Sequence, residues 1–400
     1  MPWLRQGFII GLSMGFLKIR KLKSCDKYIM NSQSNQQKNK IIQVNSSSDT
    51  GGGSQVMWDI SFGLNQFFDF VILAPKGFFM DKYKEAGFKV NTLTGIKFLK
   101  IRKEIKTGKP AIINAHGTRA AIWARLAVLF SKERPKIVYT LHGFHILRKN
   151  FILRFVFLRL EKFLNHFTDI LVCVSQADKE LVLGKKVINL NKIKVIRNGI
   201  ELEKFNVSPE LAEAKRNESG LKDNFVLVSV GRLHPQKDFS TLIKAVNLVE
   251  EQIINLKVLI IGDGPLNQDL KREVGELGLM DKILFLGERK DVPEFIAMSE
   301  GVILSTNWEG LALVPLEAGA AGKAVIASRV GGVEESILDG ETGFLFEPGS
   351  EKDLADKILM LYQSKELRKK IGEMAFQFVS DNFSKERMVK EHKQLYQNLL

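Results

Sequence analysis

The sequence predicts an α/β protein with two domains, each a doubly wound parallel sheet with helices on both faces. Its 400 residues exceed what a single hydrophobic core usually covers. Short apolar runs alternate with helical patterns, which is typical of parallel sheets buried on both faces. These runs form two series of similar length, and the polar segment near residues 205–222 separates them.

Residues 1–39 are expected to form an extension outside the fold. The apolar stretch from Gly7 to Leu17 has eleven residues, whereas a helix that spans a bilayer needs roughly 20. It resembles the core of a signal peptide, but no small-residue cleavage site follows it. The extension is either a disordered, membrane-touching tail or the product of a start site assigned too early, with Met30 as the true start.

Eleven apolar runs are predicted strands. The first series is IIQV (41–44), FVILA (70–74), AIINA (111–115), KIVYTL (136–141), ILVCV (170–174) and IKVIR (193–197). The second series is FVLVSV (225–230), LKVLII (256–261), ILFL (283–286), GVILS (301–305) and AVIA (324–327). We expect a first domain over residues 40–215, a second over 216–380, and a final helix, 381–400, that crosses back to the first domain.

The charge is distributed unevenly along the chain. Residues 1–200 hold 34 Lys and Arg against 12 Asp and Glu, whereas residues 201–400 hold 25 against 33. A lysine-rich proteome would explain a basic chain but not the acidic second half. The first half is therefore expected to face something anionic.

The cysteines and the metal-binding residue types give only negative signals. Cys25 and Cys173 are the only cysteines; two are too few for a disulfide framework, and they lack metal-ligand spacing. This usage fits a reducing cytoplasm. Without an Asp-x-Asp pair or a histidine cluster, we expect neither a metal nor another cofactor.

In open parallel sheets the ligand binds beyond the carboxyl ends of the strands, and several motifs of the first half follow predicted strands. Three glycines, among them Gly52 and Gly53, precede Ser54, which is the expected cap of a helix that starts near Gln55. Such a turn can bind an anion, although glycine turns also serve tight packing. The strand-end histidines are His116, His142 and His145.

Two loops of the second half suit a diphosphate. Arg232 directly follows a predicted strand, and Lys237 lies five residues further on. A guanidinium binds a diphosphate bidentately and an ammonium acts as a point charge. The segment IIGDGPL, with Gly262 and Gly264, resembles a nucleotide-binding turn. It lacks the full dinucleotide fingerprint, which argues against a nicotinamide cofactor.

The stretch WEGLALVPLEAG (308–319) places two glutamates among small and apolar residues. Pro315 is expected near the start of a helix, with Glu317 in its first turn and Glu309 in the loop before it. The backbone N–H groups of that loop would face the crevice with the helix dipole; the loop residues are Gly310, Leu311, Ala312, Leu313 and Val314. Glu317 could accept hydrogen bonds from a ribose diol, while Glu309 would lie nearer to phosphates and sugar.

With these motifs the chain resembles the retaining glycosyltransferases of family four, which have the GT-B fold. Two glutamates separated by seven residues carry the resemblance. Further motifs occur in family order: GGGSQ, TLHGFH, GRLHPQKDF, IGDGP, AVIASRVGGVEE and GETGFLFEPG. The resemblance covers about residues 40–400. The family's usual proline before a strand is Ala324 here, and the segment from about residue 75 to 110 is short, which makes the acceptor pocket the least transferable part.

The resemblance implies specific roles. Arg232 and Lys237 would hold the donor diphosphate, Glu317 the ribose, and Glu309 with the amides after it the sugar. His142 would lie beside the transfer site, and the glycine loop 51–53 would close over the diphosphate. His116 and His145 are assigned to the acceptor side.

The predicted function is a metal-independent retaining hexosyltransferase that uses a nucleotide sugar. Its acceptor would be a glycan or a lipid-linked molecule in capsule or lipopolysaccharide synthesis. The alternatives are a nucleotide-sugar epimerase of the same fold and a basic nucleic-acid-binding protein. No nucleic-acid recognition motif occurs in the basic half, and such a protein would leave both glutamates unexplained.

The segment 146–164 interleaves basic and aromatic residues, namely Arg148, Lys149, Arg154, Arg159 and Lys162 with Phe151, Phe155, Phe157 and Phe163. Basic, aromatic-rich helices suit anionic membrane surfaces. The alternative is a core helix whose arginines extend to water. We expect a cytoplasmic protein that binds peripherally to the inner face of the cytoplasmic membrane.

Overall fold

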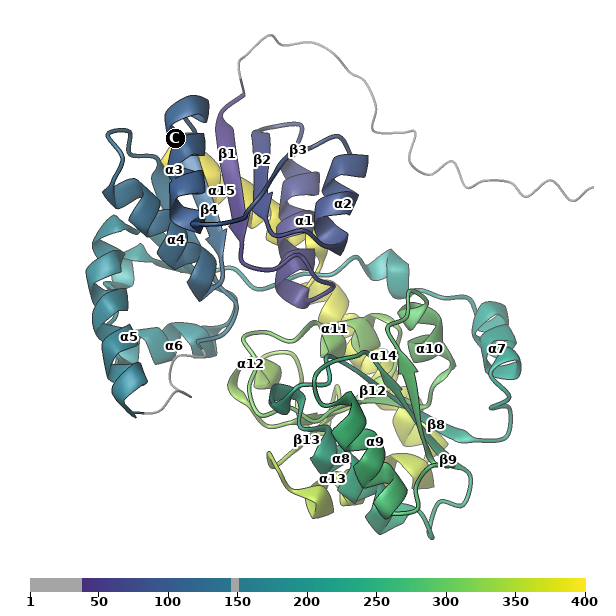
Figure 1. Ribbon diagram of the computed structural model, residues 1–400. Helices are drawn as coiled ribbons and strands as arrows, with labels where there is room; N and C mark the ends of the chain where they lie inside the picture. The colour runs from purple at the N-terminus through teal and green to yellow at the C-terminus, as the bar shows by residue number, and fades with distance from the viewer. Residues whose placement is uncertain (1–37, 145–150) are drawn as a thin grey trace, which may run out of the picture. The chain divides into compact units, whose positions relative to one another are not determined.

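The computed structural model describes residues 38–144 and 151–400, and it contains two parallel sheets with helices on both faces of each (Figure 1). The first sheet has seven strands in the order β3-β2-β1-β4-β5-β6-β7, and the second has six in the order β10-β9-β8-β11-β12-β13. The predicted fold class is confirmed. The extension 1–37 lies outside the described residues.

The strands of the first sheet are β1 (Lys40–Asn45), β2 (Asp69–Ala74), β3 (Lys89–Thr92), β4 (Ile112–His116), β5 (Lys136–Leu141), β6 (Ile170–Cys173) and β7 (Ile193–Val195). The helices in this part of the chain are α1 (Gly52–Leu64), α2 (Phe78–Glu85), α3 (Lys97–Gly108), α4 (Thr118–Leu129), α5 (Phe151–Leu164) and α6 (Gln176–Gly184). Neighbouring side chains of β1 enter different cores, Ile41 on one face of the sheet and Ile42 on the other. Burial on both faces explains why the strand sequences are continuously apolar.

The strands of the second sheet are β8 (Phe225–Val230), β9 (Leu256–Ile261), β10 (Ile283–Gly287), β11 (Gly301–Leu304), β12 (Ala324–Ser328) and β13 (Phe344–Phe346). Its helices are α7 (Pro209–Glu218), α8 (Phe239–Val249), α9 (Asn267–Glu276), α10 (Val292–Met298), α11 (Leu313–Ala320), α12 (Gly331–Glu334), α13 (Glu351–Gln363) and α14 (Lys365–Asn382). None of the helices in the described ranges is long and apolar enough to cross a bilayer.

Two edge strands escaped the prediction. β3 has the sequence KVNT and β13 the sequence FLF, and each ends its sheet. Edge strands are often short. β3 is mostly polar, and β13 is apolar but only three residues long, so neither has the long apolar run that marks the inner strands.

The chain passes between the two sheets twice, and the two passages pair with each other. Ile200 donates its N–H to Phe383 O at 2.9 Å and accepts from Lys385 N at 2.9 Å. The last helix, α15 (Lys385–Leu399), then packs beside α1 in the core of the first sheet (Figure 1, yellow).

The passage at Ile200 precedes the domain boundary expected at residues 215/216. Lys215 of α7 pairs with Asp291 at 2.7 Å, and Arg216 pairs with Glu300 at 2.8 Å. These ion pairs attach α7 to the second sheet.

Candidate functional site

The loop after β8 and the loop after β11 are joined around an ion pair. Lys237 Nζ lies 2.6 Å from Glu309 Oε1, and both side chains are largely buried. Thr306 Oγ1 donates to the same carboxylate oxygen at 3.0 Å, and Ser305 Oγ donates to Lys237 O at 3.1 Å. Lys237 and Glu309, assigned separately to diphosphate and sugar, thus lie in direct contact and are held by both loops.

Arg232 lies on the same loop as Lys237 but is exposed. In residues 38–144 and 151–400 no carboxylate forms an ion pair with it. Its guanidinium can therefore bind an anion without breaking a described ion pair.

Helix α11 begins earlier than expected. Its first residue is Leu313 and its cap is Ala312, so Leu313 and Val314 belong to the helix rather than to the approach loop. Glu317 consequently lies in the second turn, not the first. The approach loop is Gly310, Leu311 and Ala312. The first N–H groups of a helix have no intrahelical acceptor, which leaves this end suited to an anion.

Glu317 is half-buried, and none of the described residues hydrogen-bonds to its carboxylate. Burial raises the pKa of Glu317, while Lys204 and Lys237 act in the opposite direction. The half-buried carboxylate has no hydrogen-bond partner among the described residues and can accept hydrogen bonds from a ligand.

Gly262 and Gly264 have a packing function in this structure. A Cβ on Gly262 would clash with the carbonyl oxygen of Gly231, and one on Gly264 with that of Leu233. The N–H of Gly264 donates to its neighbour Asp263 at 2.7 Å. α9 begins at Asn267, two residues after Pro265.

Two histidines of the first sheet meet at the ends of β4 and β5. His116 Nδ1 lies 3.1 Å from His142 Nε2, and the two rings are nearly parallel. His116 is 1% exposed and stacks on His142; its assignment to the acceptor side stays a prediction. His145 lies outside the described residues.

The glycine turn after β1 differs in detail from the prediction. α1 begins at Gly52 with Gly51 as its cap, and Ser54 is a buried residue inside the helix rather than its cap. A Cβ on Gly52 would lie 3.3 Å from Leu313 Cδ1, and one on Gly53 would lie 3.4 Å from His142 Cδ2. The starts of α1 and α11 therefore lie close to each other and to His142.

The backbone around His142 is fixed by residues that were not predicted. Gly143, at φ 91°, and Phe144 each donate an N–H to Asp178 at 3.0 Å. Asp178 is buried, and this raises its pKa to about 7 although both hydrogen bonds oppose the shift. Gly310 packs directly on the backbone of residues 142–143, where a side chain would clash.

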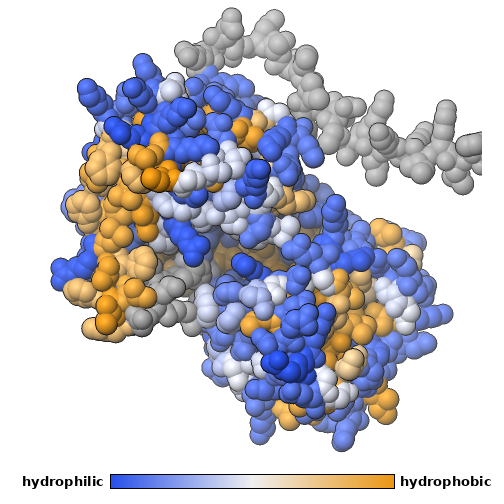
Figure 2. Space-filling model, viewed as in Figure 1, coloured by the Kyte–Doolittle hydropathy of each residue, from blue (hydrophilic) through white to orange (hydrophobic). Residues whose placement is uncertain are grey.

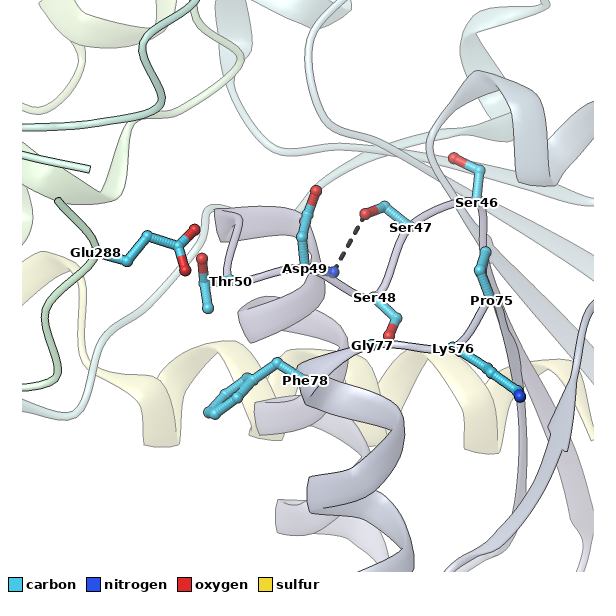
Figure 3. Close-up of a pocket in the computed structure, with 10 residues that line it drawn as sticks. All are labelled: Ser46, Ser47, Ser48, Asp49, Thr50, Pro75, Lys76, Gly77, Phe78 and Glu288. Carbon is cyan, nitrogen blue, oxygen red and sulfur yellow. Dashed lines mark hydrogen bonds between the residues drawn. The ribbon is translucent and has the colours of Figure 1, made fainter. Parts of the chain in front are cut away.

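A cavity of about 380 Å³ lies directly before the start of α1 (Figure 3). It is lined by residues 46–50, residues 75–78 and Glu288, which follows β10. Hydroxyl groups, two carboxylates, a lysine and the half-exposed ring of Phe78 surround it. This mixture of hydrogen-bonding groups and one aromatic face suits a polyhydroxylated ligand.

The part of the chain that the structure describes holds no group of three His, Cys, Asp or Glu side chains able to bind a metal ion. Around α11 the site offers a ligand the charged side chains of Arg232, Lys237, Glu309 and Glu317.

Comparison with known proteins identifies the class of enzyme. The family model of "Glycosyl transferases group 1" matches residues 212–378, and that of "Glycosyltransferase Family 4" matches residues 50–204. The N-acetyl-alpha-D-glucosaminyl L-malate synthase of Bacillus anthracis is 31% identical over 287 residues, which cover 70% of this chain and 72% of the relative. The chain therefore belongs to the group 1 glycosyltransferases.

Two further relatives bear on fold and function. The UDP-Gal:alpha-D-GlcNAc-diphosphoundecaprenol alpha-1,3-galactosyltransferase of Escherichia coli is 34% identical over 254 residues, covering 62% of this chain and 65% of the relative. The crystal structure of Anabaena HepE in complex with UDP-glucose matches with a TM-score of 0.81 at 22% identity, covering 90% of this chain and 99% of that one. This structural likeness shows that the fold is GT-B.

Proposed function

We propose that this protein is a metal-independent retaining hexosyltransferase that takes its sugar from a nucleotide sugar. The observation that carries the proposal is the arrangement around α11. The Lys237–Glu309 pair, the unpartnered carboxylate of Glu317 and the open helix start occur together. A nucleotide sugar has a group for each of these. Its diphosphate would meet Lys237 and the helix start, its sugar would meet Glu309, and its ribose diol would meet Glu317.

The diphosphate would bind between Arg232, Lys237 and the N–H groups that begin α11. As the bond between the sugar and the phosphate breaks, negative charge develops on the leaving oxygen. Fixed cations and amides stabilise that charge most strongly in the transition state. Because these groups are supplied by the chain itself, we propose that the reaction needs no metal ion.

The transfer step would proceed on one face of the sugar. The acceptor oxygen forms its bond to the anomeric carbon on the side from which the diphosphate departs. The proton of the acceptor hydroxyl passes to the departing phosphate oxygen. Glu309 would bind sugar hydroxyls, and His142 would lie beside the reacting centre.

For the acceptor we propose a lipid-linked diphosphate sugar in the synthesis of a cell-envelope polysaccharide. The galactosyltransferase of E. coli acts on such an acceptor by its name. The B. anthracis relative is named for a small acid, malate. Both acceptors are anionic, which agrees with the basic first half of the chain. Of the two, the lipid-linked acceptor is favoured by the surface of α5.

Helix α5 presents apolar side chains to solvent beside basic ones. Figure 2 shows an apolar patch over this side of the molecule. Its most exposed large side chains are Phe151 (72%), Ile152 (72%), Val156 (55%), Phe155 (53%) and Phe163 (52%). Arg154 lies over the ring of Phe151, and Arg159 over that of Phe155. Arg148 and Lys149 lie outside the described residues.

The helix is held in this orientation by a buried ion pair. Glu161 accepts two hydrogen bonds of 2.9 Å from Arg125 of α4, and both residues are fully buried. The outer face of α5 is thus a fixed surface. We propose that it docks on the anionic inner face of the cytoplasmic membrane, where each nearby Lys or Arg adds roughly 1 kcal/mol.

Co-sedimentation of the full chain with vesicles tests the docking surface. We expect binding to phosphatidylglycerol vesicles that weakens with salt, because the attraction between exposed charges is screened. The double variant Arg154→Glu, Arg159→Glu should lose most of this binding. The matched control, Lys352→Glu with Lys365→Glu on α13 and α14, makes the same charge change at exposed positions. An equal loss of vesicle binding in both variants would show that the binding depends only on net charge, and it would contradict α5 as the docking surface.

A binding screen across uridine, guanosine and adenosine diphosphate sugars tests the donor. Uridine diphosphate sugars come first, because the E. coli relative is named for UDP-Gal. We expect one nucleotide class to raise the unfolding temperature and its sugar to be transferred or slowly hydrolysed. Lys237→Ala should lower turnover on the order of 10²-fold.

A further inference from the structure

A chain of buried polar side chains runs from the C-terminal helix to His142. Tyr396 of α15 accepts hydrogen bonds from Asn114 Nδ2 at 2.7 Å and from Gln43 Nε2 at 3.3 Å. Gln43 Oε1 lies 2.9 Å from His116 Nε2, and His116 Nδ1 lies 3.1 Å from His142 Nε2. Tyr396, Asn114 and Gln43 are fully buried. Buried polar groups need partners, and each of these finds its partner within this chain.

The network determines which nitrogen of His116 carries the proton. Burial lowers the pKa of His116 well below 6.5, and nearby His142 lowers it further, so the ring is neutral with one N–H and one acceptor nitrogen. Nε2 faces the acceptor Gln43 Oε1 at 2.9 Å and the donor Asn114 Nδ2 at 3.2 Å. The contact with Gln43 is the shorter of the two, and an unprotonated Nε2 would place two acceptor atoms against each other there, so we assign the proton to Nε2, which donates to Gln43.

The orientation of the two amides follows from their other contacts. Asn114 Oδ1 accepts from Thr140 Oγ1 at 2.8 Å, so its Nδ2 must face Tyr396 and His116. Gln43 bridges the same two residues, with its Nε2 towards Tyr396 and its Oε1 towards His116. The two amides therefore act in opposite directions on His116: the Gln43 oxygen, at 2.9 Å, favours a proton on Nε2, whereas the Asn114 amide, at 3.2 Å, would donate to an unprotonated Nε2.

We propose that Gln43 and Tyr396 are positioning residues that hold His116 with its proton on Nε2, Gln43 by accepting the Nε2–H hydrogen bond and Tyr396 by binding the Asn114 amide, so that Nδ1 of His116 accepts a hydrogen bond from His142 Nε2–H. His142 is thereby fixed in ring orientation, and one of its nitrogens is permanently a donor. The inference rests on the proposed function, in which His142 lies beside the reacting sugar. It extends the site through His116 to the last helix of the chain.

Two substitutions disturb the tautomer in the same direction. Gln43→Leu removes the acceptor of the Nε2 proton and leaves only the Asn114 donor facing that nitrogen. Tyr396→Phe removes the acceptor of the Asn114 amide, whose nearest remaining acceptor is His116 Nε2 at 3.2 Å. In both variants the proton of His116 should move towards Nδ1, and His142 Nε2 must then accept.

A matched control separates positioning from mere burial. Tyr83 is a fully buried tyrosine of the same core as Tyr396, and its hydroxyl bonds to Ser61 Oγ at 3.3 Å. Tyr83→Phe therefore removes a comparable buried hydroxyl that has no link to either histidine.

The test combines ring-nitrogen spectra of ¹⁵N-histidine-labelled protein with kinetics on the sugar nucleotide that the screen identifies. We expect Gln43→Leu and Tyr396→Phe to shift the ring-nitrogen signals of His116 and His142. They should lower kcat about ten- to a hundred-fold, as for a misplaced catalytic group, with the affinity for the nucleoside diphosphate unchanged. Tyr83→Phe should change neither the signals nor kcat.

Unshifted histidine signals in both network variants would overturn the proposal, as would an equal loss of kcat in Tyr83→Phe. A wild-type protein that turns over no nucleotide sugar would overturn the proposed function instead. The histidine signals of Gln43→Leu would still decide whether the network sets the tautomer.

Discussion

The substitution Glu317→Gln is expected to have opposite effects on stability and on nucleotide binding. The carboxylate of Glu317 is half-buried, no described residue hydrogen-bonds to it, and burial raises its pKa above the ordinary value of 4.5. Gln has the same shape but no charge to bury. The variant should therefore be more stable without ligand, by on the order of 1 kcal/mol. That corresponds to about 2–4 °C in Tm for a domain of this size.

The pH dependence of the stability gain follows from the raised pKa. Between the unfolded and the folded pKa of Glu317, the folded wild type binds more protons than the unfolded chain. Its stability therefore falls as pH rises through that window. The Gln variant does not lose stability in this way. The difference in free energy of unfolding between the variant and the wild type should therefore be small near pH 4.5 and largest at alkaline pH.

Nucleotide affinity should change the other way. A carboxylate can accept two hydrogen bonds from a ribose diol, whereas the Gln amide offers only one oxygen. Losing one hydrogen bond to a charged group costs about 1.5–3 kcal/mol, or about ten- to 150-fold in Kd. Calorimetric titration with the nucleoside diphosphate measures this, and Glu309→Gln is the control that should bind normally but transfer slowly. Unchanged affinity in Glu317→Gln, or reversed behaviour of the two variants, would refute the assignment.

Three further predictions concern the charged groups. Lys237→Ala and Arg232→Ala should each lower turnover on the order of 10²-fold. Arg232 is exposed, so its variant should keep its Tm, whereas Lys237→Ala removes the partner of the largely buried Glu309 and should lower Tm; near-normal rates in both would exclude a diphosphate at this loop. Activity should survive EDTA, and a complete loss restored by Mg²⁺ would show that the reaction uses a metal. Burial lowers the pKa of His392 to about 4, so stability should decrease by on the order of 3 kcal/mol as pH falls from about 6.5 to 4, because the unfolded chain binds the proton first. Acid titration of unfolding should show a weaker decrease in His392→Leu, and an identical pH slope would contradict this origin.

The inner strands could be predicted because both their faces are buried. FVLVSV and LKVLII are apolar apart from Ser229 and Lys257, and their predicted bounds match β8 and β9. Helix starts were less certain. Pro315 does lie near the start of α11, but the helix begins two residues before it, at Leu313, which moves Glu317 into the second turn. The sequence does not show which of the first helical positions a proline occupies.

The site was predicted as separate motifs, and the contacts between them were not. Positions directly after predicted strands were enough to identify Arg232, Lys237, Glu309 and Glu317 as candidate site residues. The contact between Lys237 and Glu309 could not be predicted in this way, because it depends on how two loops 72 residues apart meet. The sequence did contain an indication of the polar network around His116. Gln43 interrupts IIQV and Asn114 interrupts AIINA, and polar residues inside fully buried strands require partners. Their partner, Tyr396, lies on the last helix and is found only in three dimensions.

Binding of nucleoside diphosphates to the wild type, Lys237→Ala and Glu317→Gln most directly tests whether α11 forms the donor site. We expect one nucleoside diphosphate to bind the wild type without added metal. Both substitutions should weaken this binding, and Glu317→Gln should also raise the unfolding temperature of the free protein. Tight binding that neither substitution affects would place the nucleotide elsewhere and contradict the proposed site.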